Sequence, residues 1–320
     1  MQPLLEVRNL RTSFFTDAGE VRAVDGVSFS VEPGKLMGLV GESGSGKTAS
    51  VLSIMRLLPE SARVIGGSIL FEQRSLLELS EPEMRAVRGA KIAMIFQEPM
   101  TSLNPVFTVG SQIAEAIRLH QRTSRHQTHE RTVEALRLVG IADPERRVND
   151  YPHQLSGGMR QRVMIAMALA CNPRLLIADE PTTALDVTIQ AQILDLIHDL
   201  QKRLQLAVIL VTHDLGIVAQ YADDVTILYA ARVMEQAPSA ALFQKPLNPY
   251  TVGLLESIPG VDGERRRRLR AIPGTIPSAL NPPSGCRFHP RCPMAIDDCA
   301  KVDPPLEMKA PQHLAACIRV

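Results

Sequence analysis

Hydrophobic and polar positions along the chain first indicate strands and then an alternation of strands with helices. Over the first 40 residues, β-branched and aromatic positions are separated by turn residues at 17–19 and 33–34, as in short strands. Residues 35–41 form an apolar run suited to a buried central strand, and a helix is predicted from about residue 48 to residue 58.

A more polar, helical pattern fills residues 98–157. Amphipathic stretches at 113–119 and 132–139 indicate an inserted helical subdomain. Strand and helix patterns then alternate at 175–178, 189–204, 207–211 and 225–229. This alternation predicts a parallel sheet with crossover helices, and therefore an α/β fold.

Beyond about residue 232 the composition shifts to prolines and turn residues, so we place a domain boundary there. The charge run at 264–270 is expected to be a solvated linker rather than a nucleic-acid patch. This segment is too short to build a substantial core of its own, so something other than apolar burial should hold it together. Four of the five cysteines fall within it, at Cys286, Cys292, Cys299 and Cys317.

Charge and hydropathy narrow the class of protein. Lys plus Arg number 35 and Asp plus Glu 34, so the net charge of +1 gives no sign of a polyanionic partner such as DNA. The longest apolar run, 163–171, falls short of the roughly 18 residues that a membrane-spanning helix needs. The first residues also lack the pattern of a secretory signal, so we expect a cytosolic location, where disulfides are disfavoured.

Residues 41–48 fit the phosphate-loop pattern G-x-x-x-x-G-K-[ST], directly after the apolar strand and at the start of a helix. In that context backbone amides converge on phosphate oxygens, the lysine bridges the β- and γ-phosphates and the threonine ligates Mg²⁺. A chance glycine loop is the alternative, and the flanking strand and helix argue against it. The predicted nucleotide ligands are Gly41, Ser43, Gly44, Ser45, Gly46, Lys47 and Thr48.

A second apolar run, residues 175–178, ends in two acids, Asp179 and Glu180. Both carboxylates are expected at the carboxyl edge of the sheet, beside the phosphate loop. Asp179 suits Mg²⁺ binding, and Glu180 suits a general base that polarises the attacking water. Without a phosphate loop, two solvated acids in a turn would be the better interpretation.

Residues 155–162, LSGGMRQR, narrow the choice among P-loop enzymes, and here the chain resembles the ABC (ATP-binding cassette) ATPase family. Ser156 is expected to cap a helix, and the free amides of Gly157 and Gly158 to form a second phosphate cradle. The resemblance implies that this signature loop contacts the ATP held by a partner subunit. Met159 departs from the Gln that many relatives carry, and a helix cap without a ligand is the alternative.

Three further residues follow in the order of that family. Gln97 resembles the glutamine that meets Mg²⁺ and the water, Asp186 lies in a stretch resembling the loop that crosses the dimer interface, and His213 resembles the histidine that holds the γ-phosphate. A histidine after a strand, taken alone, is more often structural than catalytic. Phe14 is the candidate for stacking on adenine, with Phe15 as the alternative.

The tail resembles the C-terminal extension of di- and oligopeptide importer ATPases, through PLNPYT at 246–251 and GCRFHPRCP at 285–293. The resemblance then covers essentially the whole chain. It implies the ABC ATPase fold: a parallel-sheet core, an antiparallel β subdomain, a helical insert and a small Cys-rich extension. The expected domains are a nucleotide-binding α/β core at 1–97 and 158–231, the helical subdomain with the signature loop at 98–157, and the extension at 232–320.

The same resemblance implies an ATP- and Mg²⁺-dependent subunit that powers a di- or oligopeptide importer at the cytoplasmic face of the inner membrane. The expected partners are a second, identical or homologous ABC ATPase, two transmembrane permease subunits docked near the Gln97 loop and, indirectly, an extracytoplasmic peptide-binding protein. No nucleic-acid partner is expected. Import of another solute such as nickel, or a soluble ABC ATPase acting on nucleic acid, are the alternatives.

The tail cysteines are spaced C-x5-C-x6-C-x17-C. Four thiolates can close around zinc or a [4Fe-4S] cluster, and this spacing matches neither the tight pairs usual for zinc nor the ferredoxin run. The resemblance to the cysteine-bearing extension of peptide-importer ATPases favours a [4Fe-4S] cluster with a structural role. Zinc and free, buried thiols are the alternatives.

Overall fold

The computed structural model describes residues 2–97, 103–183, 185–257 and 271–320. The chain divides into two compact units. Unit 1 comprises Met1–Glu32, Leu36–Leu77 and Val211–Val320, and unit 2 comprises Pro33–Lys35 and Glu78–Leu210. The linker predicted at 264–270 lies outside the described residues.

An antiparallel sheet in unit 1 has the strand order β2-β1-β4-β5. Its strands are β1 (Leu5–Thr16), β2 (Gly19–Val31), β4 (Ala62–Phe71) and β5 (Arg74–Ser75). Val7 of β1 pairs with Phe29 of β2 and Ile69 of β4, and all three side chains are buried. This sheet is the antiparallel subdomain that the family resemblance implies.

A second group of strands in unit 1 has the order β11-β12-β10-β9-β3. β3 (Leu36–Val40) and β9 (Asp224–Tyr229) are parallel, whereas β10 (Arg232–Pro238), β11 (Glu307–Ala310) and β12 (His313–Ala315) pair antiparallel. The parallel core strands are apolar and almost wholly buried, as the sequence predicted. Arg232, the first residue of β10, pairs with Tyr229, the last residue of β9. The domain boundary predicted at about residue 232 remains a prediction.

The proline-rich tail shares a hydrophobic core with these strands. Tyr229, Tyr250 and Phe288 are buried, and their ring centroids lie 4.6, 5.3 and 5.2 Å apart. Cys286 and Cys292 pack against the same cluster. The expectation that something other than apolar burial holds the tail is therefore only partly right, because Phe288 joins a core that the tail does not have to build alone.

The helices of unit 1 are α1 (Lys47–Met55), α9 (Leu215–Tyr221), α10 (Ser239–Gln244) and α11 (Pro249–Glu256), with 3₁₀ turns at His289–Arg291 and Asp297–Ala300. α1 ends three residues before the predicted position 58. Arg56 takes a left-handed conformation, with φ of 50°, and its amide donates to the carbonyl oxygens of Leu52 and Ser53. This arrangement satisfies the last carbonyls of the helix and stops it.

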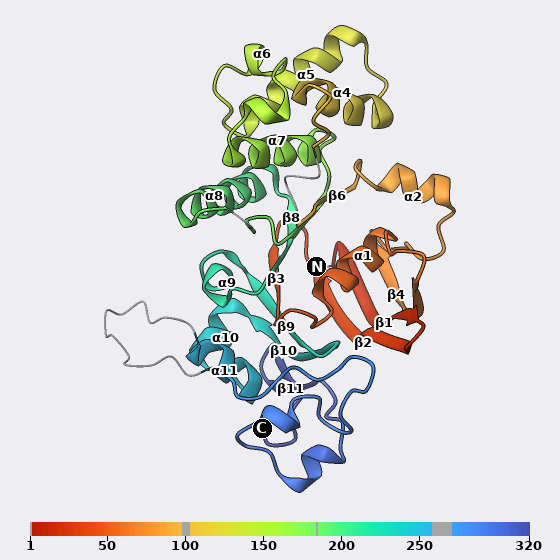
Figure 1. Ribbon diagram of the computed structural model, residues 1–320, viewed down its shortest axis with the longest axis vertical. Coiled ribbons are helices and arrows are strands. Elements are labelled where there is room, and N and C mark those ends of the chain that lie inside the picture. Colours follow the sequence, from red (N-terminus) through yellow and green to blue (C-terminus); the bar gives the residue numbers. More distant parts are fainter. Residues whose placement is uncertain (1, 98–102, 184, 258–270) are drawn as a thin grey trace. The chain divides into compact units, whose positions relative to one another are not determined.

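Unit 2 holds strands in the order β8-β7-β6, with β6 (Ile92–Ile95) parallel to β7 (Leu175–Asp179) and with most of β8 (Ala207–Thr212). The helices of this unit include α2 (Glu81–Val87) and α8 (Val187–Leu204). The expected helical insert is present as α4 (Val109–His120), α5 (Arg125–Leu138) and α6 (Pro144–Arg147), gathered with α7 (Gly157–Leu169) in one bundle (Figure 1). Within the described ranges, no helix is both long enough and apolar enough to cross a bilayer.

Candidate nucleotide-binding site

The phosphate loop, residues 41–48, joins β3 to α1 in unit 1. Close backbone approach requires glycine at two of its positions. A Cβ on Gly41 would stand 2.1 Å from the Leu228 carbonyl oxygen, and one on Gly46, where φ is 102°, would stand 2.3 Å from the Ala23 carbonyl oxygen. The glycines therefore let the loop fold tightly against β9 and β2 as it enters the helix.

Lys47 lies buried at the N-terminus of α1. Its Nζ donates to the carbonyl oxygens of Gly41 at 2.7 Å and Glu42 at 3.1 Å, so the ammonium sits inside the turn of the loop. Thr48 is exposed beside it, and Ser45 Oγ is buried without a hydrogen-bond partner among the described residues. A lysine, backbone amides and the positive end of a helix in one place can bind phosphate oxygens.

In unit 2 the structure brings Gln97 and Glu180 together. They follow β6 and β7, whose parallel pairing places both carboxyl ends at one edge. Gln97 Nε2 donates to Glu180 Oε2 at 3.0 Å, and Thr183 Oγ1 donates to the same oxygen at 3.2 Å. Asp179, the last residue of β7, directly precedes Glu180 and is buried. The predicted base is thus oriented by two neighbours.

Glu180 also has an uncommon backbone conformation, with φ of 46°. Side-chain-bearing residues rarely adopt this left-handed region, and such strain concentrates at functional sites. The conformation turns the chain sharply at the end of β7. The role of Glu180 as general base remains a prediction.

Two helix caps of unit 2 lie side by side. Ser156 Oγ accepts a hydrogen bond from an amide in the first turn of α7 at 3.3 Å, which confirms the predicted cap. Asp186 Oδ1 accepts from the Ile189 amide at 3.0 Å and caps α8. A Cβ built on Gly158 would stand only 2.9 Å from Ile189 Cγ2. The signature loop, which continues through Gly157 into α7, and the Asp186 loop therefore share one edge of unit 2.

Gln161 is a residue that the sequence patterns did not single out. Its side chain is fully buried, and Nε2 donates to the Pro181 carbonyl oxygen at 2.6 Å. This bond ties the signature helix to the turn that follows Glu180. A polar residue in a helix is usually solvent-facing, so no sequence signal would have found this contact without the structure.

His213 and Phe14 lie in unit 1. His213 follows β8 and is exposed, directly before Asp214, the residue that caps α9. Phe14 is half-buried on β1, whereas Phe15 is 41% exposed with the Arg63 guanidinium 4.4 Å above its ring centroid. Their roles toward the γ-phosphate and adenine remain predictions.

The tail cysteines lie near enough to influence one another's ionisation. Burial raises the pKa of the Cys286 thiol to about 11, and the charges of Cys299, Cys317 and Cys292 add to the shift. Burial also raises the pKa of Cys292, with Cys317 and Cys299 again contributing. Cys171 belongs to unit 2, where its thiol donates to the Ala116 carbonyl oxygen at 3.5 Å.

Three of these sulfurs share a local hydrogen-bond pattern. The sulfurs of Cys286, Cys292 and Cys317 each accept a hydrogen bond from the backbone amide two positions further on. The Arg319 amide nitrogen lies 3.4 Å from Cys317 Sγ. Such bonds stabilise a thiolate. In the part of the chain that the structure describes, no group of three or more His, Cys, Asp or Glu is arranged to hold a metal ion.

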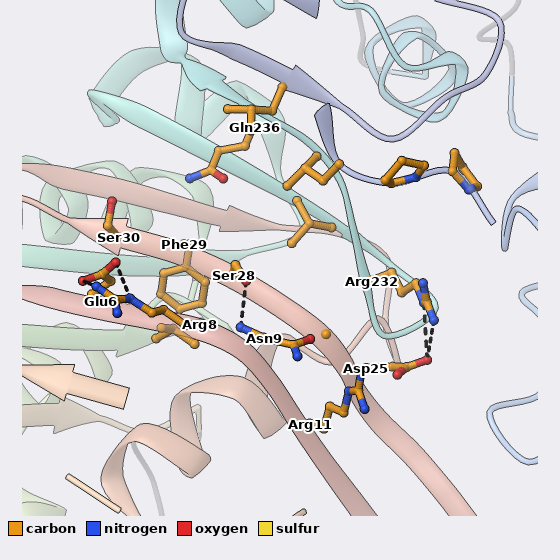
Figure 2. Close-up of a pocket in the computed structure, with 17 residues that line it drawn as sticks. Glu6, Arg8, Asn9, Arg11, Asp25, Ser28, Phe29, Ser30, Arg232 and Gln236 are labelled. Atoms are coloured by element: carbon orange, nitrogen blue, oxygen red, sulfur yellow. Dashed lines mark hydrogen bonds and ion pairs between the residues drawn. The ribbon is translucent and has the colours of Figure 1, made fainter. Parts of the chain in front are cut away.

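A polar pocket of about 480 Å³ lies between β1, β2 and β10 of unit 1. Figure 2 shows Arg232 and Asp25 pointing toward one another at its edge. Arg232 Nη2 lies 2.9 Å from Asp25 Oδ2. Burial opposes ionisation of Asp25, but Arg232 and Arg287 hold its pKa below the usual value. None of the predicted ATP ligands lines this pocket, so it is not the candidate site.

A phosphate loop between a buried strand and a helix, with a strand-end carboxylate oriented by a glutamine, defines a P-loop ATPase. The family model described as "ABC transporter" matches residues 24–183, and the one described as "Oligopeptide/dipeptide transporter, C-terminal region" matches residues 234–299. The chain belongs to the ATP-binding protein family of ABC transporters, in its oligopeptide/dipeptide branch.

Relatives match over nearly the full length. A "Probable peptide ABC transporter ATP-binding protein" of Sinorhizobium fredii is 56% identical over 317 residues, covering 99% of this chain and 95% of that protein. The oligopeptide transport ATP-binding protein AppD of Bacillus subtilis is 52% identical over 307 residues, covering 96% and 93%. The dimeric ATP-binding cassette MJ0796, solved in a post-hydrolysis state with ADP and Pi, superposes with a TM-score of 0.66 at 26% identity, covering 73% of this chain and 98% of that one. The predicted fold class and ATPase activity are confirmed.

Proposed function

We propose that this chain is the ATP-hydrolysing subunit of a di- or oligopeptide importer, held at the cytoplasmic face of the membrane by its partners. The observation that carries the proposal is the match of residues 234–299 to the C-terminal region of oligopeptide/dipeptide transporters. The nucleotide-binding core alone would not distinguish one cargo from another, because it serves ATP and not the solute.

In this proposal each ATP is sandwiched between the Lys47 loop of one subunit and the Ser156 loop of a second ATPase, identical or homologous. Binding closes the pair and hydrolysis reopens it. The side-by-side caps of Ser156 and Asp186 support a shared interface edge, because both loops would face the same partner.

The hydrolytic roles follow from the strand ends. Glu180 accepts a proton from the attacking water while Gln97 holds the carboxylate in place. Mg²⁺, when bound, neutralises phosphate charge, and Thr48, Gln97 and Asp179 are the residues that would hold it. His213 would contact the γ-phosphate.

The remaining partners are two transmembrane permease subunits, docked near the Gln97 loop, and an extracytoplasmic peptide-binding protein that acts through them. Closure of the ATPase pair would reach the permeases through that loop. Nickel is the rival cargo, since the same ATPase core would serve it.

The test uses the chain with its permease partners in proteoliposomes. We expect ATP-dependent uptake of labelled di- or oligopeptides, and no uptake when Lys47→Ala replaces the wild-type subunit, because that change removes the phosphate-binding ammonium. Nickel uptake without peptide uptake would overturn the assignment of cargo. ATP hydrolysis stimulated by nucleic acid, in a chain that does not copurify with membranes, would overturn the transporter role.

We further propose that Cys286, Cys292, Cys299 and Cys317 hold a [4Fe-4S] cluster of structural use, with zinc as the alternative. The chemistry of the donors supports the proposal, since four sulfur ligands are the set that such a cluster takes and three of the sulfurs already accept amide hydrogen bonds. Burial and mutual repulsion disfavour the thiolates of Cys286 and Cys292, and a bound metal would relieve both effects.

Protein purified without oxygen should be brown and contain about four irons per chain. Cys299→Ser should remove most of the colour and lower the unfolding temperature, because Cys299 is the most buried of the four. Cys171→Ser is the matched control and should change neither property. Colourless protein that contains one zinc per chain would show that the site holds zinc and not a cluster. Metal-free protein with four titratable tail thiols would contradict both the cluster and the zinc site.

A further inference from the structure

The C-terminal segment binds the second residue of the phosphate loop. Arg291 Nη1 donates to Glu42 Oε2 at 2.7 Å, and Nη2 donates to Oε1 at 3.1 Å. The Glu42 amide donates to the Tyr250 hydroxyl at 3.2 Å. These partners lie 249 and 208 residues from Glu42 along the chain, yet all belong to unit 1.

Arg291 is itself fixed by its surroundings. Nη1 also donates to the Tyr229 hydroxyl at 3.3 Å, and Nε donates to the Pro273 carbonyl oxygen at 3.0 Å. The Arg291 side chain is 5% exposed and that of Glu42 is 25% exposed. A bidentate arginine–carboxylate pair with this much burial is more directional than a surface ion pair and less screened by salt.

Glu42 passes this restraint to the rest of the loop. Its carbonyl oxygen accepts from the Ser45 amide at 3.1 Å and from Lys47 Nζ at 3.1 Å. The residue is therefore held on both sides, by the tail through its amide and carboxylate, and by the loop through its carbonyl.

The loop contains three glycines between positions 41 and 46, and glycine loses more backbone entropy on ordering than any other residue. A loop that is ordered before the ligand arrives avoids that cost during binding. We propose that Arg291 is a positioning residue for ATP binding: through Glu42 it presets the phosphate loop and Lys47 for the nucleotide. The C-terminal extension thereby takes part in ATP binding, whatever solute the transporter carries.

The experiment measures equilibrium binding of labelled ATP with Mg²⁺ to the full chain, and the steady-state rate of hydrolysis. Arg291→Gln should weaken ATP binding by about tenfold. The rate at saturating ATP should change much less, because bound phosphates then order the loop. Arg291→Lys should fall between, since an ammonium keeps the charge but cannot make the two parallel bonds.

The matched control is Arg287→Gln in the same segment. Arg287 is also a buried arginine paired with a carboxylate, donating to Asp25 Oδ2 at 2.7 Å, but its partner lies on β2 and not in the phosphate loop. We expect the ATP affinity of Arg287→Gln to stay within about twofold of wild type. This control separates a general destabilisation of the C-terminal segment from the loss of the Glu42 contact.

A double-mutant cycle decides whether Arg291 acts through Glu42. Glu42→Gln should weaken binding about as much as Arg291→Gln, and the double variant should be no weaker than either alone. The proposal would be overturned if the losses of affinity in the two single variants multiplied in the double variant. It would also be overturned if folded Arg291→Gln protein bound ATP with wild-type affinity, or if Arg287→Gln lost as much affinity as Arg291→Gln. If Arg291→Gln does not fold, Glu42→Gln decides alone, and wild-type affinity there counts against the proposal.

Discussion

Replacing Glu180 by Gln should lower the rate of ATP hydrolysis by roughly a hundredfold or more, because a positioned general base contributes at least that factor. ATP affinity should be unchanged, since the phosphate loop is untouched. The amide has nearly the shape of the carboxylate and can still bond to Thr183, which limits structural disturbance. The measurement is single-turnover hydrolysis together with equilibrium ATP binding.

Two comparisons make this result specific. Glu145→Gln is the same chemical change on the exposed surface of unit 2, where the carboxylate pairs with Arg137, and it should leave hydrolysis as it is. Lys47→Ala should show the opposite pattern, with ATP binding itself lost. Hydrolysis by Glu180→Gln at a rate near wild type would remove this residue from the mechanism.

The parts of the site that the sequence predicted are those set by local structure. The apolar strand, the glycine loop and the following helix are contiguous, so position in the chain fixes their chemistry. The Ser156 cap is equally local, because a serine before a helix accepts from an amide three residues on. The acids after residue 178 were predictable because parallel strands end at one edge of a sheet.

The contacts that the sequence did not predict join remote residues or depend on backbone detail. The Glu42–Arg291 pair spans 249 residues, and no periodicity or motif links two side chains at that distance. Phe288 was missed as a core residue for the same reason, because its neighbours Tyr229 and Tyr250 come from other elements. The left-handed conformations of Arg56 and Glu180 are uncommon for residues that carry a side chain, so residue type does not predict them.

Ser156→Arg should lower the rate of ATP hydrolysis by the paired ATPase, again by roughly a hundredfold or more. ATP binding to an isolated subunit should be unchanged. The residue caps α7 at the edge shared with Asp186. In this mechanism it contacts the ATP held by the partner subunit and not the ATP bound by the Lys47 loop of its own subunit. A long side chain there would keep the partner's nucleotide from reaching the amides of Gly157 and Gly158.

Ser156→Ala separates this effect from the loss of the cap. Both variants remove the hydroxyl that accepts the first-turn amide, at a cost of about 1 kcal/mol in stability, but only arginine adds bulk at the interface. We expect the alanine variant to hydrolyse ATP within several-fold of wild type and to pair in the presence of ATP, as followed by sedimentation. Because the signature loop is assigned to the partner's nucleotide, an arginine variant that cannot bind ATP as a monomer, while remaining folded, would refute the head-to-tail arrangement.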